Sequence, residues 1–288
     1  MKRNSLFIWS VALATSGLFG SCGGGEDPQA KLVEAITPSS FSYVVDSDGV
    51  GRVFAGPTYR ITFDDDKKTA SISMENVRWD DNMQPASFGY SDVAWKFNPA
   101  NDARVIDADM VLPDTNGEPE ITDFDVVMYD PVECGNGLLL TGLSVSYTAP
   151  GNYRVTNVPY RTIFIGSTET VDGRDNTSFV STDIIYSVDI DPNRLVAAMK
   201  MQNVAFAEGM PIIDMELGQL TVIPVDGGYE LLGSDIVPSV SGTPYEQFKV
   251  TGLHMKVNLQ GESELAFDCM GDAYHVTAYF EATYGDGH

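Results

Sequence analysis

The residues best suited to catalysis are few in this 288-residue chain. Histidine, the most frequent general base, occurs only as His254, His275 and the terminal His288. His254 and His275 stand in alternating, strand-like sequence, where a solvent-facing or hydrogen-bonded histidine is commoner than a catalytic one. No G-x-S-x-G, P-loop, G-x-G-x-x-G or H-E-x-x-H motif occurs. We therefore predict no catalytic residue, no cofactor and no enzymatic activity.

Carboxylates, in contrast, are abundant, with 41 Asp and Glu in the chain. Two of them can divide acid and base roles only if they converge in a pocket with separated pKa values, which spacing alone does not establish. The stretch "DSDGVG", from Asp46, begins like a calcium loop, but Pro57 stands where an EF-hand needs its bidentate Glu. We interpret this stretch, and Asp64 to Asp66, as solvated turns, and we predict no metal site.

The first residues form a targeting segment. Lys2 and Arg3 precede an apolar run, Leu6 to Gly20, which is shorter than the roughly 20 residues that a membrane-spanning helix needs. The run leads into "GSC", and this ending resembles the lipobox of bacterial lipoproteins, in which the Cys is lipidated and becomes the N-terminus. The resemblance implies a signal peptide over 1–21 and lipid attachment at Cys22.

The residues after Cys22 add a location. A run of glycines followed by Glu26 and Asp27 is similar to the export tag of surface lipoproteins in the Bacteroidetes. The resemblance implies a lipid-anchored protein on the surface of a Gram-negative outer membrane. The glycines would serve as a flexible tether.

Charge narrows the choice of partners. The net charge is −24, and loss of the two cations Lys2 and Arg3 with the signal peptide makes it −26. An acidic surface repels phosphate backbones, so nucleic acid is excluded as a partner. It also repels anionic lipid, so we expect membrane contact through the anchor alone.

A piece of the chain occurs twice. "TYRITFDDDKKTASISMENV" from Thr58 aligns without a gap with "IYSVDIDPNRLVAAMKMQNV" from Ile185. Both copies alternate apolar and polar residues on either side of an Asp-containing turn, which predicts a β-hairpin with one buried face. Further along, "YRVTNVPYRT" from Tyr153 resembles "YHVTAYFEAT" from Tyr274. The mature chain is therefore predicted to be a tandem duplication.

The fold class follows from this pattern. We predict two duplicated antiparallel all-β domains, each a barrel or sandwich of about seven to nine strands. The lipoprotein start, the size and the doubled unit together resemble the calycin-like or lipocalin-like β-domain lipoproteins of gut Bacteroidales. The predicted boundaries are a tether at 22–37, β-domain 1 at 38–165, a linker at 166–177 and β-domain 2 at 178–288. Only Pro28 to Ile36, ahead of the first domain, favours a short helix.

The repeat also predicts which side chains are buried. Met74 and Met201 continue the apolar phase of equivalent strands, so both should lie in the core. Their neighbours Asn76 and Asn203 are expected at a shared strand end or bulge.

Aromatic and cysteine side chains have two interpretations each. Trp79 and Trp95 could stack on a sugar ring, but their partner positions in the second copy are the apolar Phe206 and Val222, which favours core packing. Cys134 and Cys269 could pair in an exported protein. They lie in stretches that do not align with each other, which favours two free thiols in loops.

Three classes of function remain. A non-enzymatic module that binds a glycan or a small apolar molecule ranks first, because barrels and sandwiches commonly bind at their mouths or loops. A structural or adhesive subunit of the fimbrial type, with a protein partner, ranks second. Such a subunit should release a terminal strand, whereas the final strand here, "YHVTAYFEATYG", is expected to be integral to the second domain. A hydrolase with an unrecognised carboxylate site ranks third.

Overall fold

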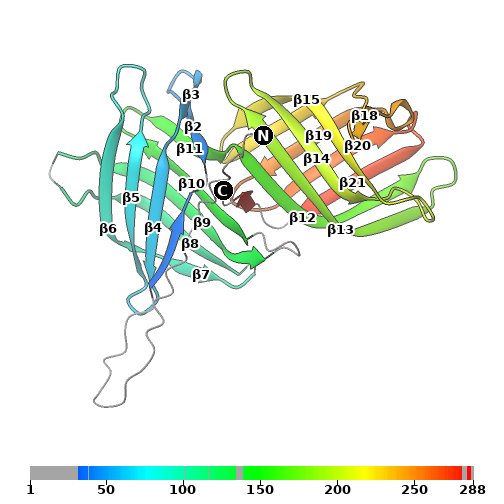
Figure 1. The fold of residues 1–288 in the computed structure, drawn as a ribbon. Helices are drawn as coiled ribbons and strands as arrows, with labels where there is room; N and C mark the ends of the chain where they lie inside the picture. The colour runs from blue at the N-terminus through cyan, green and yellow to red at the C-terminus, as the bar shows by residue number, and fades with distance from the viewer. Residues whose placement is uncertain are drawn as a thin grey trace, which may run out of the picture.

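The computed structural model describes residues 32–37, 39–100, 102–115, 117–133, 139–280 and 284–286. These residues are almost entirely β-strand, and the helical structure among them is one short 3-10 helix, η1 (Glu246–Phe248). The strands form two antiparallel units that follow one another along the chain (Figure 1). The predicted all-β fold with two duplicated units is confirmed.

The first unit consists of two sheets packed face to face. One sheet has the order β1 (Leu32–Ile36), β4 (Thr58–Asp64), β5 (Thr69–Val77), β6 (Ala86–Ala94). Pairing along the other sheet runs β3 (Gly51–Ala55), β2 (Ser40–Val45), β11 (Tyr153–Pro159), β10 (Leu139–Ala149), β9 (Ile121–Glu133), β8 (Ala103–Val111), β7 (Lys96–Asn98). Side chains from both sheets, including Phe63 and Phe124, share one apolar core.

The second unit is a closed antiparallel barrel of 8 strands. Its order is β12 (Arg161–Asp172), β13 (Ser178–Asp191), β14 (Val196–Val204), β15 (Ile213–Val225), β16 (Gly228–Gly233), β19 (Val250–Asn258), β20 (Ser263–Cys269), β21 (Tyr274–Phe280), and β21 pairs back with β12. The short strands β17 (Ser239–Val240) and β18 (Thr243–Pro244) form a hairpin between β16 and β19. A closed barrel has no sheet edge with unpaired backbone N–H and C=O groups.

The duplication is preserved in the strand register. Tyr59 of β4 pairs with Met74 of β5, and the equivalent residues Tyr186 and Met201 pair in the same way between β13 and β14. A slip of one residue would reverse the buried face, so the shared register explains why the alternation is kept in both copies.

The duplication also extends to irregular backbone. A β-bulge interrupts the pairing of β5 with β6 between Met74 and Val77, and another lies at the equivalent place between β14 and β15. Within these bulges Asn76 and Asn203 have left-handed φ angles of 57° and 64°. Asn tolerates this conformation better than most residues, which explains its presence in both copies. The predicted shared bulge is confirmed.

The units differ because one strand of the first unit is interrupted. In the barrel, β15 continues through Val222 and pairs with β16. The equivalent stretch in the first unit is broken at Trp95 into β6 and β7, which belong to different sheets. Trp95 lies in the core at this break, as Val222 does in the barrel, and meets Phe63 edge-on at 5.6 Å between ring centroids. The first unit therefore stays open where the second closes.

The two units are joined by more than a chain connection. Strand β2 is buried on both faces, with Val44 in the first core and Phe41 packed in the core of the barrel. Strand β22 (Tyr284–Asp286) pairs with β10 of the first unit and with β12 of the second. Between the units, Arg154 Nη1 lies 2.9 Å from Asp226 Oδ2. The packing of β2, the pairing of β22 and this ion pair therefore hold the two units together.

Three sequence predictions are corrected by these elements. The segment predicted as a linker, 166–177, contains the end of β12, which is paired on both sides in the barrel, and the turn that follows it. Leu32–Ile36, predicted as tether or helix, is strand β1, because pairing with the edge of β4 outweighs its local helix preference. Cys269 ends strand β20 and is buried, so it does not lie in a loop.

Candidate functional site

The interior of the barrel is filled by side chains. Phe164, Tyr186, Phe206 and Tyr229 are among the largest fully buried residues of the chain. The interior of an eight-stranded barrel is narrow enough for side chains to fill it, and side chains as large as these take up much of that space. The Tyr229 hydroxyl donates to Thr162 Oγ1 at 3.0 Å. Burial raises the pKa of Tyr186 to about 12, so its hydroxyl stays protonated.

The first unit is filled in the same way. The hydroxyl groups of Tyr59 and Tyr147 lie 3.3 Å apart, and both side chains are buried in the core. Burial raises the pKa of each phenol. Ser42 Oγ lies 3.5 Å from the Tyr59 hydroxyl. These contacts serve packing, and an apolar ligand would have to displace them to enter.

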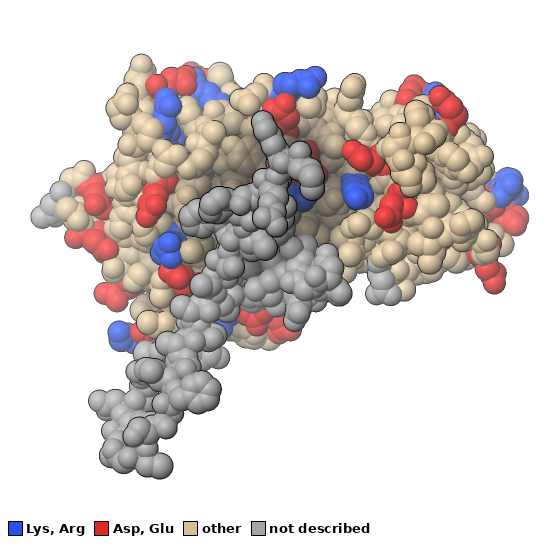
Figure 2. All heavy atoms as spheres, viewed as in Figure 1, with Lys and Arg blue, Asp and Glu red and all other residues tan. Residues whose placement is uncertain are grey.

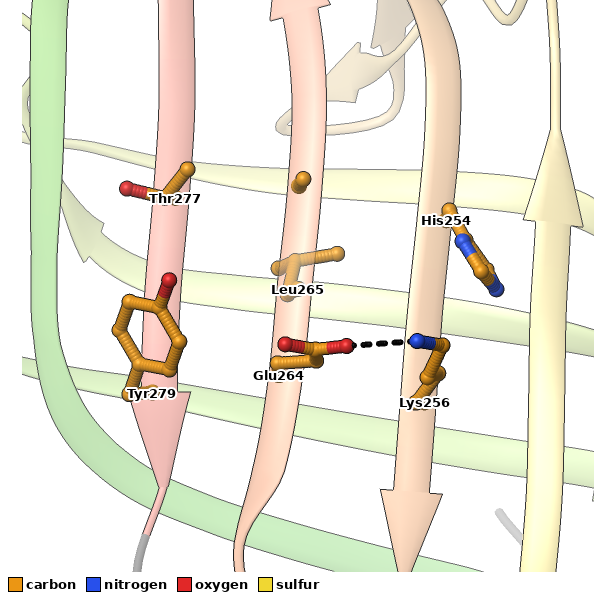
Figure 3. A pocket seen from close by; sticks show the side chains of 7 residues that line it. His254, Lys256, Glu264, Leu265, Thr277 and Tyr279 are labelled. Atoms are coloured by element: carbon orange, nitrogen blue, oxygen red, sulfur yellow. Dashed lines mark ion pairs between the residues drawn. The ribbon is translucent and has the colours of Figure 1, made fainter.

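A hollow lies instead on the outer face of the barrel, over β19, β20 and β21 (Figure 3). Strand register places His254, Ala266 and Thr277 side by side across the three strands. Ala266 is the smallest of the three, so the sheet surface is depressed at this point. The hollow has a volume of about 140 Å³.

The next row of side chains forms one wall of the hollow. Register places Lys256, Glu264 and Tyr279 side by side on the same face. Lys256 Nζ lies 2.9 Å from Glu264 Oε1, and both side chains are about half exposed. The hydrogen bond to Glu264 raises the pKa of Lys256. In Figure 3, Tyr279 lies along β21 with its hydroxyl directed toward Thr277.

His254 is held by a carboxylate at the side of the hollow. Its Nε2 atom lies 3.2 Å from Glu230 Oε2 of β16. Each cationic or titratable nitrogen at the hollow therefore faces a carboxylate. The arrangement offers hydrogen-bond donors and acceptors beside an exposed aromatic ring, and it carries no excess of positive charge.

A second, wider hollow of about 440 Å³ lies between β13 and the loop that joins β14 to β15. Its lining combines polar residues, such as Ser181 and Thr182, with apolar ones that include Val180 and Ile212, which are 57% and 71% exposed. No histidine or charged side chain lines it in the part of the chain that the structure describes.

The structure separates the residues that the sequence singled out. His254 and His275 are both on strands with carboxylate partners, as predicted, and His275 bonds to Asp268 away from the hollow lining. Trp79 and Trp95 are 8% and 7% exposed, which confirms core packing. Cys22, Cys134 and His288 lie outside the described residues.

The acidic stretches are turns, as predicted. Asp46 Oδ1 accepts hydrogen bonds from the backbone N–H groups of Asp48 and Val50. Asp64 Oδ1 accepts equivalent bonds from Asp66 and Lys67. Among the described residues, no group of three or more His, Cys, Asp or Glu is placed to hold a metal ion. Nor does any described helix have the length and apolar character needed to cross a membrane.

Sequence reasoning missed Lys256, Glu264, Thr277 and Tyr279. One signal was available for Tyr279, because it stands out of phase with Val276, Ala278 and Phe280 in an alternating strand and so had to face outward. Nothing in the spacing of the others indicated that they would meet.

Fold and hollow together define a duplicated all-β protein with filled interiors and a polar hollow on its outer surface. No protein-family model and no curated protein matches the chain. The solved structure of intact Ap-TbpB, with N and C lobes, is similar over 89% of this chain and 77% of that chain, at 10% identity and a TM-score of 0.25.

A second solved structure is a double mutant of the vaccine antigen transferrin-binding protein B from Haemophilus parasuis Hp5. It is similar over 87% of this chain and 77% of that chain, at 10% identity and a TM-score of 0.25.

Proposed function

We propose that this protein is an exported, lipid-anchored and non-enzymatic module that binds glycans through its outer surface. The observation that carries this proposal is the filling of both interiors, with Tyr59 and Tyr186 fully buried in equivalent places. A calyx for a small apolar molecule requires an internal cavity, and these side chains occupy that space. The sequence favoured either a glycan or a small apolar molecule as the ligand, and of these two the glycan is the one that an exterior site can bind.

The anchor in this proposal is Cys22, preceded by a signal peptide over 1–21 and placed in the outer membrane. Two or more acyl chains would hold the protein stably, whereas a single chain would hold it only reversibly. Acidic side chains are spread over both units on the face drawn in Figure 2, and such a surface does not favour docking on anionic lipid. Attachment therefore rests on the lipid.

A fimbrial-type subunit is less well supported. Such a subunit exchanges a terminal strand with its neighbour, but the last two strands are both paired within the chain, β22 with β10 and β12, and β21 with β20 and β12. Removing β21 would open the barrel and expose the core. We expect a monomer in solution once the anchor is removed.

The proposed anchoring is tested by Cys22→Ala in the full-length chain, expressed in a Gram-negative host. The variant should move from the membrane fraction to the soluble fraction and lose its acyl mass. Cys134→Ala is the matched control and should stay in the membrane fraction. Retention of Cys22→Ala in the membrane, together with an unacylated wild type, would show that the anchor assignment is wrong.

A further inference from the structure

The outer-face hollow has the chemistry of a sugar-binding site. We infer that it binds a single neutral pyranose ring of a glycan, stacked on Tyr279 and hydrogen-bonded to Lys256 and Glu264. This inference rests on the proposed glycan-binding function and names the site and the class of sugar.

The aromatic ring supplies the apolar half of the site. Tyr279 is 69% exposed, although β21 is paired on both sides at this residue, with Glu264 of β20 and Ser167 of β12. The face of an aromatic ring carries a negative quadrupole, and the C–H groups on one side of a pyranose are apolar and weakly positive. The two surfaces are therefore complementary, and burial of both from water is favourable.

The ion pair supplies the polar half. Lys256 Nζ and Glu264 Oε1 are held 2.9 Å apart, which fixes a charged donor and a charged acceptor beside the ring. A sugar hydroxyl can donate to the carboxylate and accept from the ammonium at once, and hydrogen bonds to charged groups are stronger than those between neutral groups. Two neighbouring hydroxyl groups on a pyranose satisfy this pair without separating it.

Charge decides between neutral and acidic sugars. Lys256 is paired with Glu264, and the nearby His254 is paired with Glu230. A carboxylated sugar would need a free cation, and it would also approach a chain with a net charge of −24. The hollow therefore favours an uncharged ring.

Size limits the ligand to one ring at a time. The volume of about 140 Å³ is well below the roughly 300–1,000 Å³ of pockets that enclose a whole drug-sized ligand. The small side chain of Ala266 forms the floor, and Thr277 adds a hydroxyl at the side. Because only one face of the ring is buried, we expect a Kd of about 1 mM for a free monosaccharide.

The experiment uses the full chain from residue 23, with labelled methyl groups, titrated in NMR spectra. The probes are the methyl glycosides of glucose, galactose and mannose, together with N-acetylglucosamine and glucuronate. We expect at least one neutral sugar to shift the methyl signals of Ala266 and Thr277 with saturation below about 50 mM, well above the expected Kd. Glucuronate should bind at least about tenfold more weakly.

Three variants test the individual contacts. Tyr279→Ala should weaken binding by about tenfold or more, whereas Tyr279→Phe keeps the ring and should stay within about threefold of wild type. Ala266→Leu fills the hollow without removing any polar group and should abolish the shifts. Phe97→Ala, at an aromatic residue of the first unit that is 49% exposed, is the control and should bind as wild type does.

Several outcomes would overturn the inference. These are unmoved Ala266 and Thr277 signals with every neutral sugar, stronger binding of glucuronate, and full binding by Ala266→Leu. Failure here leaves the anchoring result with Cys22→Ala unaffected, and a soluble Cys22→Ala variant would not rescue a hollow that binds no sugar. The proposed anchor and the proposed sugar site therefore fail separately.

Discussion

Truncation of the duplicated methionines tests whether the two copies form equivalent cores. Met74 and Met201 are each 0% exposed and belong to different core clusters. Replacing a fully buried Met by Ala removes apolar contacts and leaves a cavity, at a cost of about 2–5 kcal/mol of unfolding free energy. In a chain of this size about 1 kcal/mol lowers the Tm by about 2–4 °C. We therefore expect Met74→Ala and Met201→Ala each to lower the Tm by about 4–20 °C.

The double variant adds a sharper requirement. The two methionines share no core cluster, so their effects on the free energy of unfolding should add within about 0.5 kcal/mol. Urea denaturation followed by circular dichroism measures this free energy for the wild type, both single variants and the double variant. Met110, which is 55% exposed, provides a matched control, and Met110→Ala should change stability by less than about 0.5 kcal/mol.

Two results would refute the reasoning. If neither Met74→Ala nor Met201→Ala lowers the Tm, the repeated positions do not form cores and the register of the equivalent strands is wrong. If the double variant departs from the sum by more than about 1 kcal/mol, the two cores are coupled at these positions. If Met110→Ala lowers the free energy of unfolding as much as the two buried substitutions do, the loss of stability does not report burial.

Three further predictions concern the barrel seam, the bulges and pH. A fragment over 178–288 lacks β12 and should show no cooperative melting in calorimetry. A fragment over 161–288 keeps all barrel strands and should melt cooperatively, at a lower Tm than the full chain. Equal melting behaviour of the two fragments would contradict the observed closure. Asn76→Ala should be less stable than Asn76→Gly by about 1 kcal/mol in urea denaturation, because Asn76 has a left-handed φ of 57°; the reverse order would refute the bulge geometry. Hydrogen bonds from Arg174 lower the pKa of Asp172 to about 2. The stabilising effect of this carboxylate should therefore be complete above its unfolded pKa of about 3.9 and should disappear as the pH falls through about 2. Denaturation of the wild type and Asp172→Asn over this pH range measures the effect, and a constant difference in stability between them would contradict the prediction.

Local patterns in the sequence predicted much of the fold. Alternation on both sides of the Asp64 and Asp191 turns predicts paired strands, since side chains of successive strand residues point to opposite faces. The constant offset between Tyr59 and Tyr186 predicts the duplication, and the apolar partners of Trp79 and Trp95 predict their burial. All of these depend on neighbours in the chain, which a sequence records directly.

Other features depend on contacts between distant segments, and only the tertiary structure decided them. The end of β12 is polar and glycine-containing, and the sequence favoured a linker there; pairing with β13 and β21 makes it a barrel strand because these hydrogen bonds close the sheet. One unit closes and the other stays open because β15 runs on without a break into its pairing with β16, whereas the equivalent stretch is divided between β6 and β7 in different sheets. The hollow depends on the register of three strands, which brings Ala266 between two larger neighbours. Composition and periodicity specify which face of a strand is buried, but the choice of partner strands comes from packing of the whole chain.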